Sequence, residues 1–258
     1  MPYEHNENFT TPADDVVIWR YMDFTKYVSM LHKHALYFGQ ASVMWDKFEG
    51  SLSKPSLRML DRNFYPPMHL TDAQFDALVD DNKDFRKALP HNTRINCWYM
   101  GTDESAGMWQ QYLQGREGIA IKSTVAKLRE SLVNTTSSIY IGEVKYIDYS
   151  KGDVDFLNHH LNPFFYKRLS FSHENEVRAV IEHFDYTWDQ NCARGKFTPS
   201  PAGKFEPNVH CDLKTLIGEI YVAPQMHEWF RELVSGLAEK YELDKKVHQS
   251  NLDIDPVL

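Results

Sequence analysis

Three charged residues, Glu174, Glu176 and Arg178, recur at a spacing of two in the segment LSFSHENEVRAVI. Alternate side chains of a strand point to the same side of a sheet, so this spacing gathers two carboxylates and one guanidinium. Such a group is costly to bury unless its charges pair. The segment therefore fits either an exposed edge strand or a cleft in which Arg178 or Arg168 holds an ionised carboxylate. A carboxylate held in this way can stabilise positive charge on a sugar ring.

Arg20 is the second candidate, because it lies between Trp19 and Tyr21 in the apolar segment VVIWRYM. An arginine inside such a strand needs an anionic partner, either a carboxylate or a ligand phosphate. We expect Arg20 to lie within ion-pair reach of Glu174 or Glu176.

Two further segments combine aromatic and acidic residues. Trp109 and Tyr112 are three residues apart in MWQQY, where they form either a core face or a stacking surface for a ring. WDKFEG, residues 45–50, places Asp46 and Glu49 around an aromatic residue, as a capped loop or as part of a site.

Several standard sites have no counterpart in the sequence. It has no GxGxxG, Walker A, GxSxG or HExxH motif. None of its twelve histidines has the i, i+4 spacing of a helical metal pair joined to a carboxylate, and we predict no metal. The three cysteines, Cys97, Cys192 and Cys211, have no CxxC spacing, which favours a reducing cytoplasm over a disulfide framework.

The composition is that of a single globular domain. The chain has 258 residues, of which 42% are hydrophobic and 14% aromatic, enough for one sizeable core. Its net charge of -8 provides no general attraction for nucleic acid or an anionic membrane, so such contacts would need a local patch. No apolar run reaches the length of a membrane-spanning helix.

The pattern of strands and helices predicts an α+β fold with a single mixed sheet and flanking helices. We expect residues 1–15 to be a flexible arm and residues 16–258 to form the domain. The last helix should bury Trp229, Leu233 and Leu237 on one stripe. The predicted elements are strands at 16–22, 36–42, 95–100, 119–123, 139–147, 176–182, 217–223 and 247–254, helices near 24–31, 71–79, 105–113, 128–133 and 229–241, and a loop over 185–207.

Taken in order, these segments resemble a largely bacterial family of domains of unknown function. The resemblance rests on WRYM, ALYFGQAS, WDKFEG, INCWYM, MWQQYLQGREGIAIKS and YKRLSFSHENEVRAV, and covers residues 17–181. In the loop, Trp45 and Lys47 replace the asparagine and proline of the family's NDPFEG-like pattern. The resemblance implies a fold and no particular activity.

The opening strand, helix and strand are also similar to the start of ADP-ribosyltransferase-like domains. These domains present an arginine or histidine, then a small polar or aromatic residue, then a glutamate on successive strands. In this sequence the first position corresponds to Arg20, the second to Tyr37 or Ser42, and the third to Glu176. The resemblance implies cleavage of NAD, with Glu176 on the ribose, Arg20 on the pyrophosphate, and Tyr37 or Trp109 stacked on a ring. Ser42, Tyr112 and Arg178 complete the predicted NAD site.

Two alternatives stay open beside this NAD-cleaving enzyme. One is a non-catalytic binding or regulatory module of a bacterial defence or stress system, in which the charged cluster is a structural ion network. The other is a metal-dependent nuclease using Asp46, Glu49 and Glu176. The enzyme would act on a small nucleotide and a protein or nucleic-acid acceptor. Glu176→Gln should then leave folding nearly intact and lower NAD turnover by at least about a hundredfold.

Overall fold

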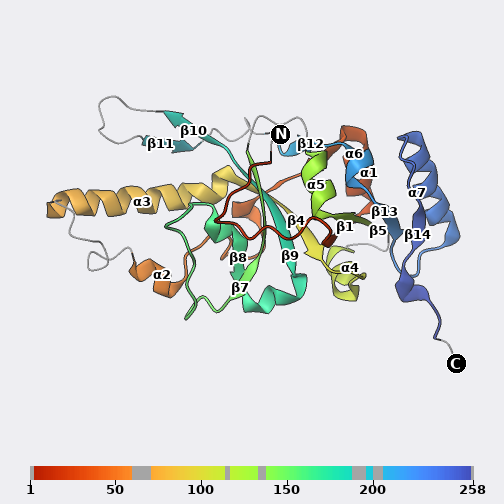
Figure 1. The fold of residues 1–258 in the computed structure, drawn as a ribbon, viewed down its shortest axis with the longest axis horizontal. Coiled ribbons are helices and arrows are strands. Elements are labelled where there is room, and N and C mark those ends of the chain that lie inside the picture. The colour runs from red at the N-terminus through yellow and green to blue at the C-terminus, as the bar shows by residue number, and fades with distance from the viewer. Residues whose placement is uncertain are drawn as a thin grey trace.

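A mixed β-sheet forms the centre of the molecule, as predicted for an α+β fold (Figure 1). The computed structural model describes residues 3–59, 71–113, 117–132, 138–187, 196–199 and 206–256. Within these residues the sheet has the order β14-β13-β5-β1-β4-β9-β6, with β3 also beside β4. All pairs are antiparallel except β13 with β14, which run parallel.

The strands of this sheet are β1 (Val17–Asp23), β3 (Gly39–Gln40), β4 (Thr93–Met100), β5 (Gly118–Thr124), β6 (Ile139–Glu143), β9 (Glu176–Glu182), β13 (Glu219–Val222) and β14 (Val247–Gln249). Three small two-stranded sheets pair β2 (Ala35–Tyr37) with β12 (Asn208–His210), β7 (Lys145–Ile147) with β8 (Tyr166–Arg168), and β10 (Phe184–Thr187) with β11 (Lys196–Pro199). The helices are α1 (Phe24–Lys33), α2 (Lys54–Arg58), α3 (Asp72–Asn92), α4 (Ala106–Tyr112), α5 (Val125–Ser131), α6 (Leu213–Leu216) and α7 (Glu228–Lys240).

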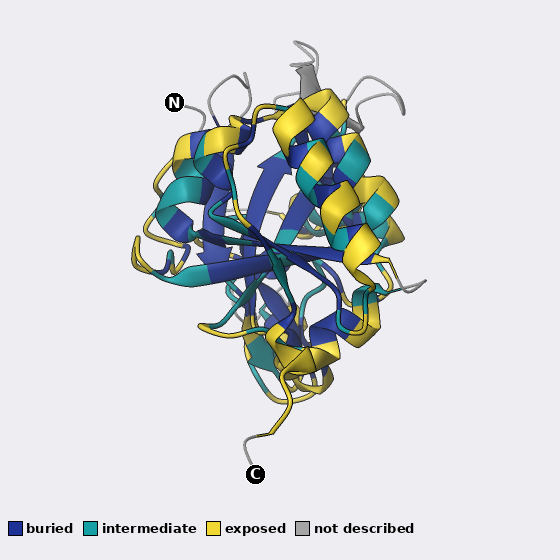
Figure 2. Ribbon diagram, turned by 90° about the vertical axis from the view of Figure 1, so that its right-hand side faces the viewer, coloured by how far each residue is buried: buried dark blue, intermediate teal, exposed yellow. Residues whose placement is uncertain are grey.

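Helices cover both faces of the sheet. On one face, α1, α5, α6 and α7 bury the larger core against apolar side chains such as Ile18, Trp98 and Val177. On the other face, α4 packs on Trp19 and Tyr21, while α3 and a 3₁₀ turn at Asn162–Phe165 pack on β4, β6 and β9. Figure 2 shows the result, with buried strands inside and exposed outer helix faces.

Local signals in the sequence explain several element boundaries. Asp23 begins α1 by accepting a hydrogen bond from the backbone N–H of Lys26 at 2.8 Å, as an N-cap does. Thr71 and Gln74 form a capping box that begins α3. That helix runs to Asn92, well past the predicted end at residue 79 and through Pro90.

The charged segment lies in the middle of the sheet. β9 pairs with β4 on one side and with β6 on the other, so the interpretation of an exposed edge strand was wrong. Its alternation is as predicted, with Val177 and Ala179 in the larger core and Glu176 and Arg178 on the opposite face. The charges of β9 are therefore buried.

A split in the sheet separates β1 from β4. The two strands pair only at Ile18 and Trp19, after which β1 continues along β5 alone. At its other end β4 pairs with β3, which follows Tyr37 in the chain. Between these two paired segments, β1 and β4 are not hydrogen-bonded to each other. Arg20 is the first residue of β1 after the segment that pairs with β4.

Three segments differ from the elements predicted for them. Residues 3–15, expected to be a flexible arm, lie along β6, where Phe9 is buried and Thr11 donates a hydrogen bond to the Ile141 carbonyl at 2.8 Å. The predicted loop over 185–207 contains the hairpin β10–β11, and its residues 188–195, with Cys192, lie outside the described residues. The predicted strand over 36–42 is divided into β2, β3 and a 3₁₀ turn.

No helix among the described residues is both long and apolar enough to cross a bilayer.

The stripe predicted for the last helix was wrong. Trp229 is 56% exposed and Leu233 is 43% exposed, whereas Phe230, Val234 and Ala238 are buried. The face of α7 that packs on the sheet therefore consists of residues that each follow a predicted residue by one position. A wide apolar surface made both assignments compatible with the spacing, and the packing of Phe24 against Phe230 selects the observed one.

We predict that Phe230→Ala lowers the free energy of unfolding by about 3–5 kcal/mol, because it leaves a cavity under α7. Leu233→Ala is the matched control and should cost less than about 1 kcal/mol, because Leu233 is half exposed. Urea unfolding of both variants measures the difference. Equal losses would contradict the observed orientation of α7.

Candidate functional site

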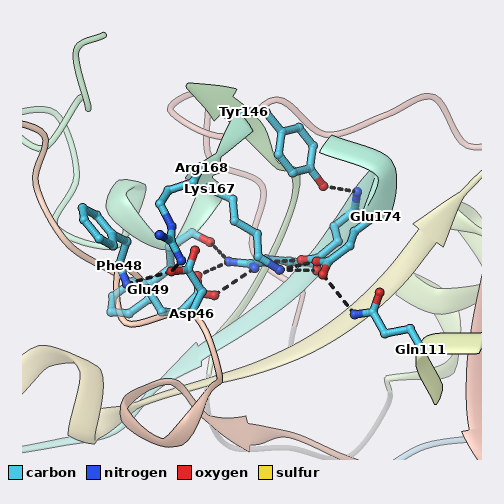
Figure 3. Close-up of polar contacts among 11 residues, drawn as sticks. Asp46, Phe48, Glu49, Gln111, Tyr146, Lys167, Arg168 and Glu174 are labelled. Carbon is cyan, nitrogen blue, oxygen red and sulfur yellow. Dashed lines mark hydrogen bonds and ion pairs between the residues drawn. The ribbon is translucent and has the colours of Figure 1, made fainter. Parts of the chain in front are cut away.

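Arg178 is the centre of a buried network of charged side chains. Figure 3 shows members of this network, among them Glu49, Lys167 and Glu174. Its side chain is fully buried, and its guanidinium binds Glu49 through both terminal nitrogens, at 2.5 Å from Nη1 and 3.1 Å from Nη2. Nε donates to Glu176 at 2.5 Å, and Nη1 also donates to the Phe164 carbonyl at 2.6 Å. These bonds use each nitrogen of the guanidinium.

Lys167 joins two carboxyl groups at the other end of the network. Its ammonium contacts Glu174 and lies 3.1 Å from Oε1 of Glu176. Glu174 also accepts a hydrogen bond from Gln111 of α4 at 3.0 Å. Lys167 thus brings the Glu174 and Glu176 carboxyl groups together. The backbone N–H of Glu176 donates to the Tyr146 hydroxyl at 2.9 Å.

A third ion pair extends the network toward the surface. Asp46 lies 2.7 Å from Nη2 of Arg168 and accepts the backbone N–H of Phe48 at 3.0 Å. The guanidinium of Arg168 contacts the rings of Phe48 and Phe171, 4.7 and 5.2 Å from their centroids. These cation–π contacts orient the arginine.

Gly50 allows the WDKFEG loop to reach this network. Its φ is +70°, and a Cβ there would lie 2.3 Å from the Phe164 ring. Any other residue would therefore combine backbone strain with a clash. Because Glu49 precedes Gly50, the tight turn sets its carboxylate against Arg178, beside the Phe164 carbonyl.

The two contacting carboxyl groups have opposite pKa shifts. Burial, together with the hydrogen bond and charge of Glu176, raises the pKa of Glu174 from 4.5 to about 7. Burial also opposes ionisation of Glu176, but Arg178, the Glu174 hydrogen bond and Lys167 outweigh it and hold the pKa of Glu176 well below its usual value. The opposite shifts mean that Glu174 is the member of the pair that takes up a proton near neutral pH, while Glu176 stays ionised.

A separate pocket of about 400 Å³ lies at the split in the sheet. Arg20 lines it with Lys26 and Lys33 of α1, and its aromatic walls include Tyr37 and Tyr112. The Tyr37 ring is 57% exposed although both of its chain neighbours are buried. None of the described lining residues is acidic. We call this cavity the Arg20 pocket.

Arg20 does not form the predicted ion pair. Its Nη1 donates to the Cys97 carbonyl at 2.6 Å, and its Nη2 to the Tyr37 carbonyl at 3.5 Å. In the strand register Arg20 shares a face with Ile121, whereas Glu176 shares the opposite face with Trp19. Alternation along the strands therefore directs the two side chains to different sides of the sheet.

The structure brings together only part of the predicted NAD site. Arg20, Tyr37 and Tyr112 line one pocket. Trp109 is buried in the core, where it packs edge-on against Tyr21 and donates to Glu104 at 2.9 Å. The other three predicted residues lie elsewhere: Ser42 lines a different pocket, and Glu176 and Arg178 belong to the buried network.

Sequence analysis missed several residues of these two sites. Lys167 and Gln111 complete the network, and Lys26 and Lys33 line the Arg20 pocket. The i, i+7 spacing of the two helical lysines is compatible with one helix face and was an available signal. Nothing in the sequence pairs Gln111 with Glu174, because they are 63 residues apart.

The carboxylates assigned to a nuclease are bonded to cations of the protein. Asp46 binds Arg168, while Glu49 and Glu176 bind Arg178. Over the part of the chain that the structure describes, no group of three or more histidine, cysteine or acidic residues could hold a metal ion.

Comparisons with protein-family models, with curated proteins and with solved structures find no match to this chain.

We predict that Glu176→Gln destabilises the fold, because it removes a carboxylate that binds both Lys167 and Arg178 in a buried site. The expected loss is about 3–5 kcal/mol of unfolding free energy. This replaces the expectation that the substitution leaves folding nearly intact. Chemical denaturation tests it, with Glu228→Gln, at an exposed position of α7, as a charge-matched control. A wild-type denaturation midpoint for Glu176→Gln would contradict a structural role.

We also predict a pH-dependent difference between wild type and Glu174→Gln. The pKa of Glu174 is raised by folding, so its contribution to stability is complete below about pH 4.5 and is lost as pH rises through about 7. Wild type should lose stability relative to Glu174→Gln between pH 5 and pH 8. Urea unfolding at four pH values measures this, and a constant difference would be inconsistent with the shift.

Proposed function

We propose that this protein is a cytoplasmic binding or regulatory module that holds a small nucleotide-type anion, such as NAD, in the Arg20 pocket. The observation that carries the proposal is the state of Arg20. Its guanidinium lines a pocket and, among the described residues, binds backbone carbonyls without a carboxylate partner. A desolvated cation of this kind favours an anion from solution.

The surroundings of Arg20 suit a phosphate. Burial lowers the pKa of the Arg20 guanidinium, because desolvation disfavours its positive charge. A bound anion would offset this desolvation cost. Lys33 adds a second positive charge at the rim, and Lys26 a third, although Lys26 is already 2.7 Å from Asp23. A pyrophosphate carries two negative charges, which this arrangement can neutralise.

The aromatic walls suit a base or nicotinamide ring. Tyr37 presents an exposed ring, and Tyr112 closes the pocket from α4. Planar heterocycles stack on such rings. The volume of about 400 Å³ lies within the range of small-molecule sites and accommodates one half of a dinucleotide, the other half extending beyond the rim.

Binding is favoured over cleavage of NAD. Breaking the nicotinamide–ribose bond needs a carboxylate close to the ribose. The predicted carboxylate, Glu176, is bonded to Lys167 and Arg178 on the other face of the sheet. An ADP-ribosyltransferase would need Glu176 released from both cations, and this loss should destabilise the fold.

The resemblance to the bacterial family of domains of unknown function acquires a physical interpretation. The segments that carry it include WDKFEG, YKR and ExExR, which supply Glu49, Lys167 and Arg178 to one network. We propose that the chain shares the fold of that family, and that these motifs stabilise it.

We predict that NAD and ADP-ribose bind to the wild-type protein and that Arg20→Gln weakens binding by about 10- to 100-fold. A charge-assisted hydrogen bond of about 1.5–3 kcal/mol would account for that loss. Tyr37→Ala should also weaken binding, and its exposed ring makes a folding defect unexpected. Isothermal titration calorimetry measures each affinity, with Arg231→Gln, at a partly exposed arginine of α7, as the matched control.

Two results would count against the proposal. One is the absence of binding to wild type, and the other is equal affinity of wild type and Arg20→Gln. Nicotinamide release by wild type would restore the enzyme interpretation, provided that Glu176→Gln abolishes release while remaining folded by circular dichroism.

A further inference from the structure

Helix α4 contacts both the Arg20 pocket and the buried network. Tyr112 lines the pocket, while the preceding residue, Gln111, donates a hydrogen bond to Glu174 at 3.0 Å. The charges of Glu176, Arg20 and Glu174 all act on the Tyr112 hydroxyl. The two sites therefore meet at the C-terminal end of α4.

The network holds more acid than base. Its ion pairs join four carboxyl groups to three cations: Asp46, Glu49, Glu174 and Glu176 to Lys167, Arg168 and Arg178. Asp46 and Glu49 each bind an arginine, and Glu176 binds Arg178 and Lys167. Glu174 is left with a share of Lys167 and the neutral Gln111. Glu174 therefore has the weakest cation pairing of the four carboxyl groups, and it is the one that accepts a proton.

We propose that anion binding in the Arg20 pocket is coupled to proton uptake by the Glu174–Glu176 carboxyl pair. The inference rests on the proposed function and adds a regulation to the same site. A bound anion neutralises Arg20 and adds negative charge beside Tyr112, and both changes disfavour a second negative charge on the pair. By linkage, a protonated pair strengthens binding.

The size of the effect follows from the charges. Charges in neighbouring sites of a protein interact at an effective dielectric constant of about 20, and an interaction equal to a tenfold change in an equilibrium constant shifts a pKa by about one unit. Starting from about 7 for Glu174, a shift of that size makes the affinity about eightfold higher at pH 6 than at pH 9. Near pH 7.5 binding would take up about half a proton.

Other groups that face Glu174 do not titrate in this range. Burial raises the pKa values of Cys97, Tyr112 and Tyr146, the first to about 12. The pKa of Lys167 is also raised, since the charges of Glu176 and Glu174 outweigh its burial. The remaining charged groups around the pair are Arg178 and Glu49.

Histidines near the two sites need a control. His173 precedes Glu174, and His34 and His210 lie at the ends of α1 and β12, close to the pocket. Protonation of a histidine near either site would also favour an anion. Only a variant of Glu174 separates proton uptake by the carboxyl pair from proton uptake by these histidines.

The test is the affinity of NAD from pH 6 to pH 9, measured by calorimetry in buffers of different ionisation enthalpy. The pyrophosphate of NAD keeps its charge over this range, so the ligand contributes no protons. Wild type should show the eightfold change and the proton uptake. Glu174→Gln, which resembles the protonated state, should bind with a nearly constant affinity close to that of wild type at pH 6. Glu228→Gln and His173→Gln should behave as wild type.

The outcomes separate this inference from the proposed function. Binding that is independent of pH in wild type, or a pH dependence that persists in Glu174→Gln, would overturn the coupling and leave the pocket intact. Should Glu174→Gln fail to fold, Gln111→Leu offers a second route: it removes a donor to ionised Glu174, so the pH dependence should move to higher pH. An unchanged profile in that variant would also overturn the coupling. If wild type binds no NAD, the proposed function fails and the coupling fails with it.

Discussion

A fully buried guanidinium constrains this fold more than any other group. Arg178 has no access to solvent, so each of its nitrogens must find an acceptor within the protein. Those acceptors come from Glu49, Glu176 and the Phe164 carbonyl, which belong to separate segments of the chain. Satisfying one side chain therefore brings a loop, a central strand and a 3₁₀ turn to one point. The tight turn at Gly50 is a consequence of that requirement.

The alternation of the central strands then divides the charged residues between two faces. Glu176 and Arg178 lie on the network face, and Arg20 reaches the opposite side where β1 leaves β4. One arginine is neutralised inside the protein, and the other lines a pocket without a carboxylate partner among the described residues. This difference, more than the residue types, makes Arg178 structural and Arg20 available to a ligand. Helix α4 is the element that contacts both.

The sequence predicted local patterns better than long-range pairing. The spacing of Val177, Ala179 and Ile181 identified β9 and its apolar face, because alternation depends only on neighbouring residues. Whether β9 is an edge or a central strand depends on β4 and β6, which no local signal specifies. The same limit explains why Arg20 was assigned to Glu176: both were recognised as needing partners, but the face that each occupies depends on the sheet register. In α7, a broad apolar surface left the buried stripe undecided between Leu233 and Val234.

The buried network also specifies the register of β9. A slip of one residue would move Glu176 and Arg178 into the apolar core and move Val177 and Ala179 against Lys167 and Glu49. A charge in the apolar core without partners costs far more than a misplaced valine. The network therefore penalises wrong pairings strongly even where its net contribution to stability is small. Its surplus carboxyl group, Glu174, lies at the end nearest α4, where a proton can be gained without disturbing the bonds of Arg178. A structural core and a proton-sensitive group can thus occupy the same cluster, because different members of the cluster perform the two tasks.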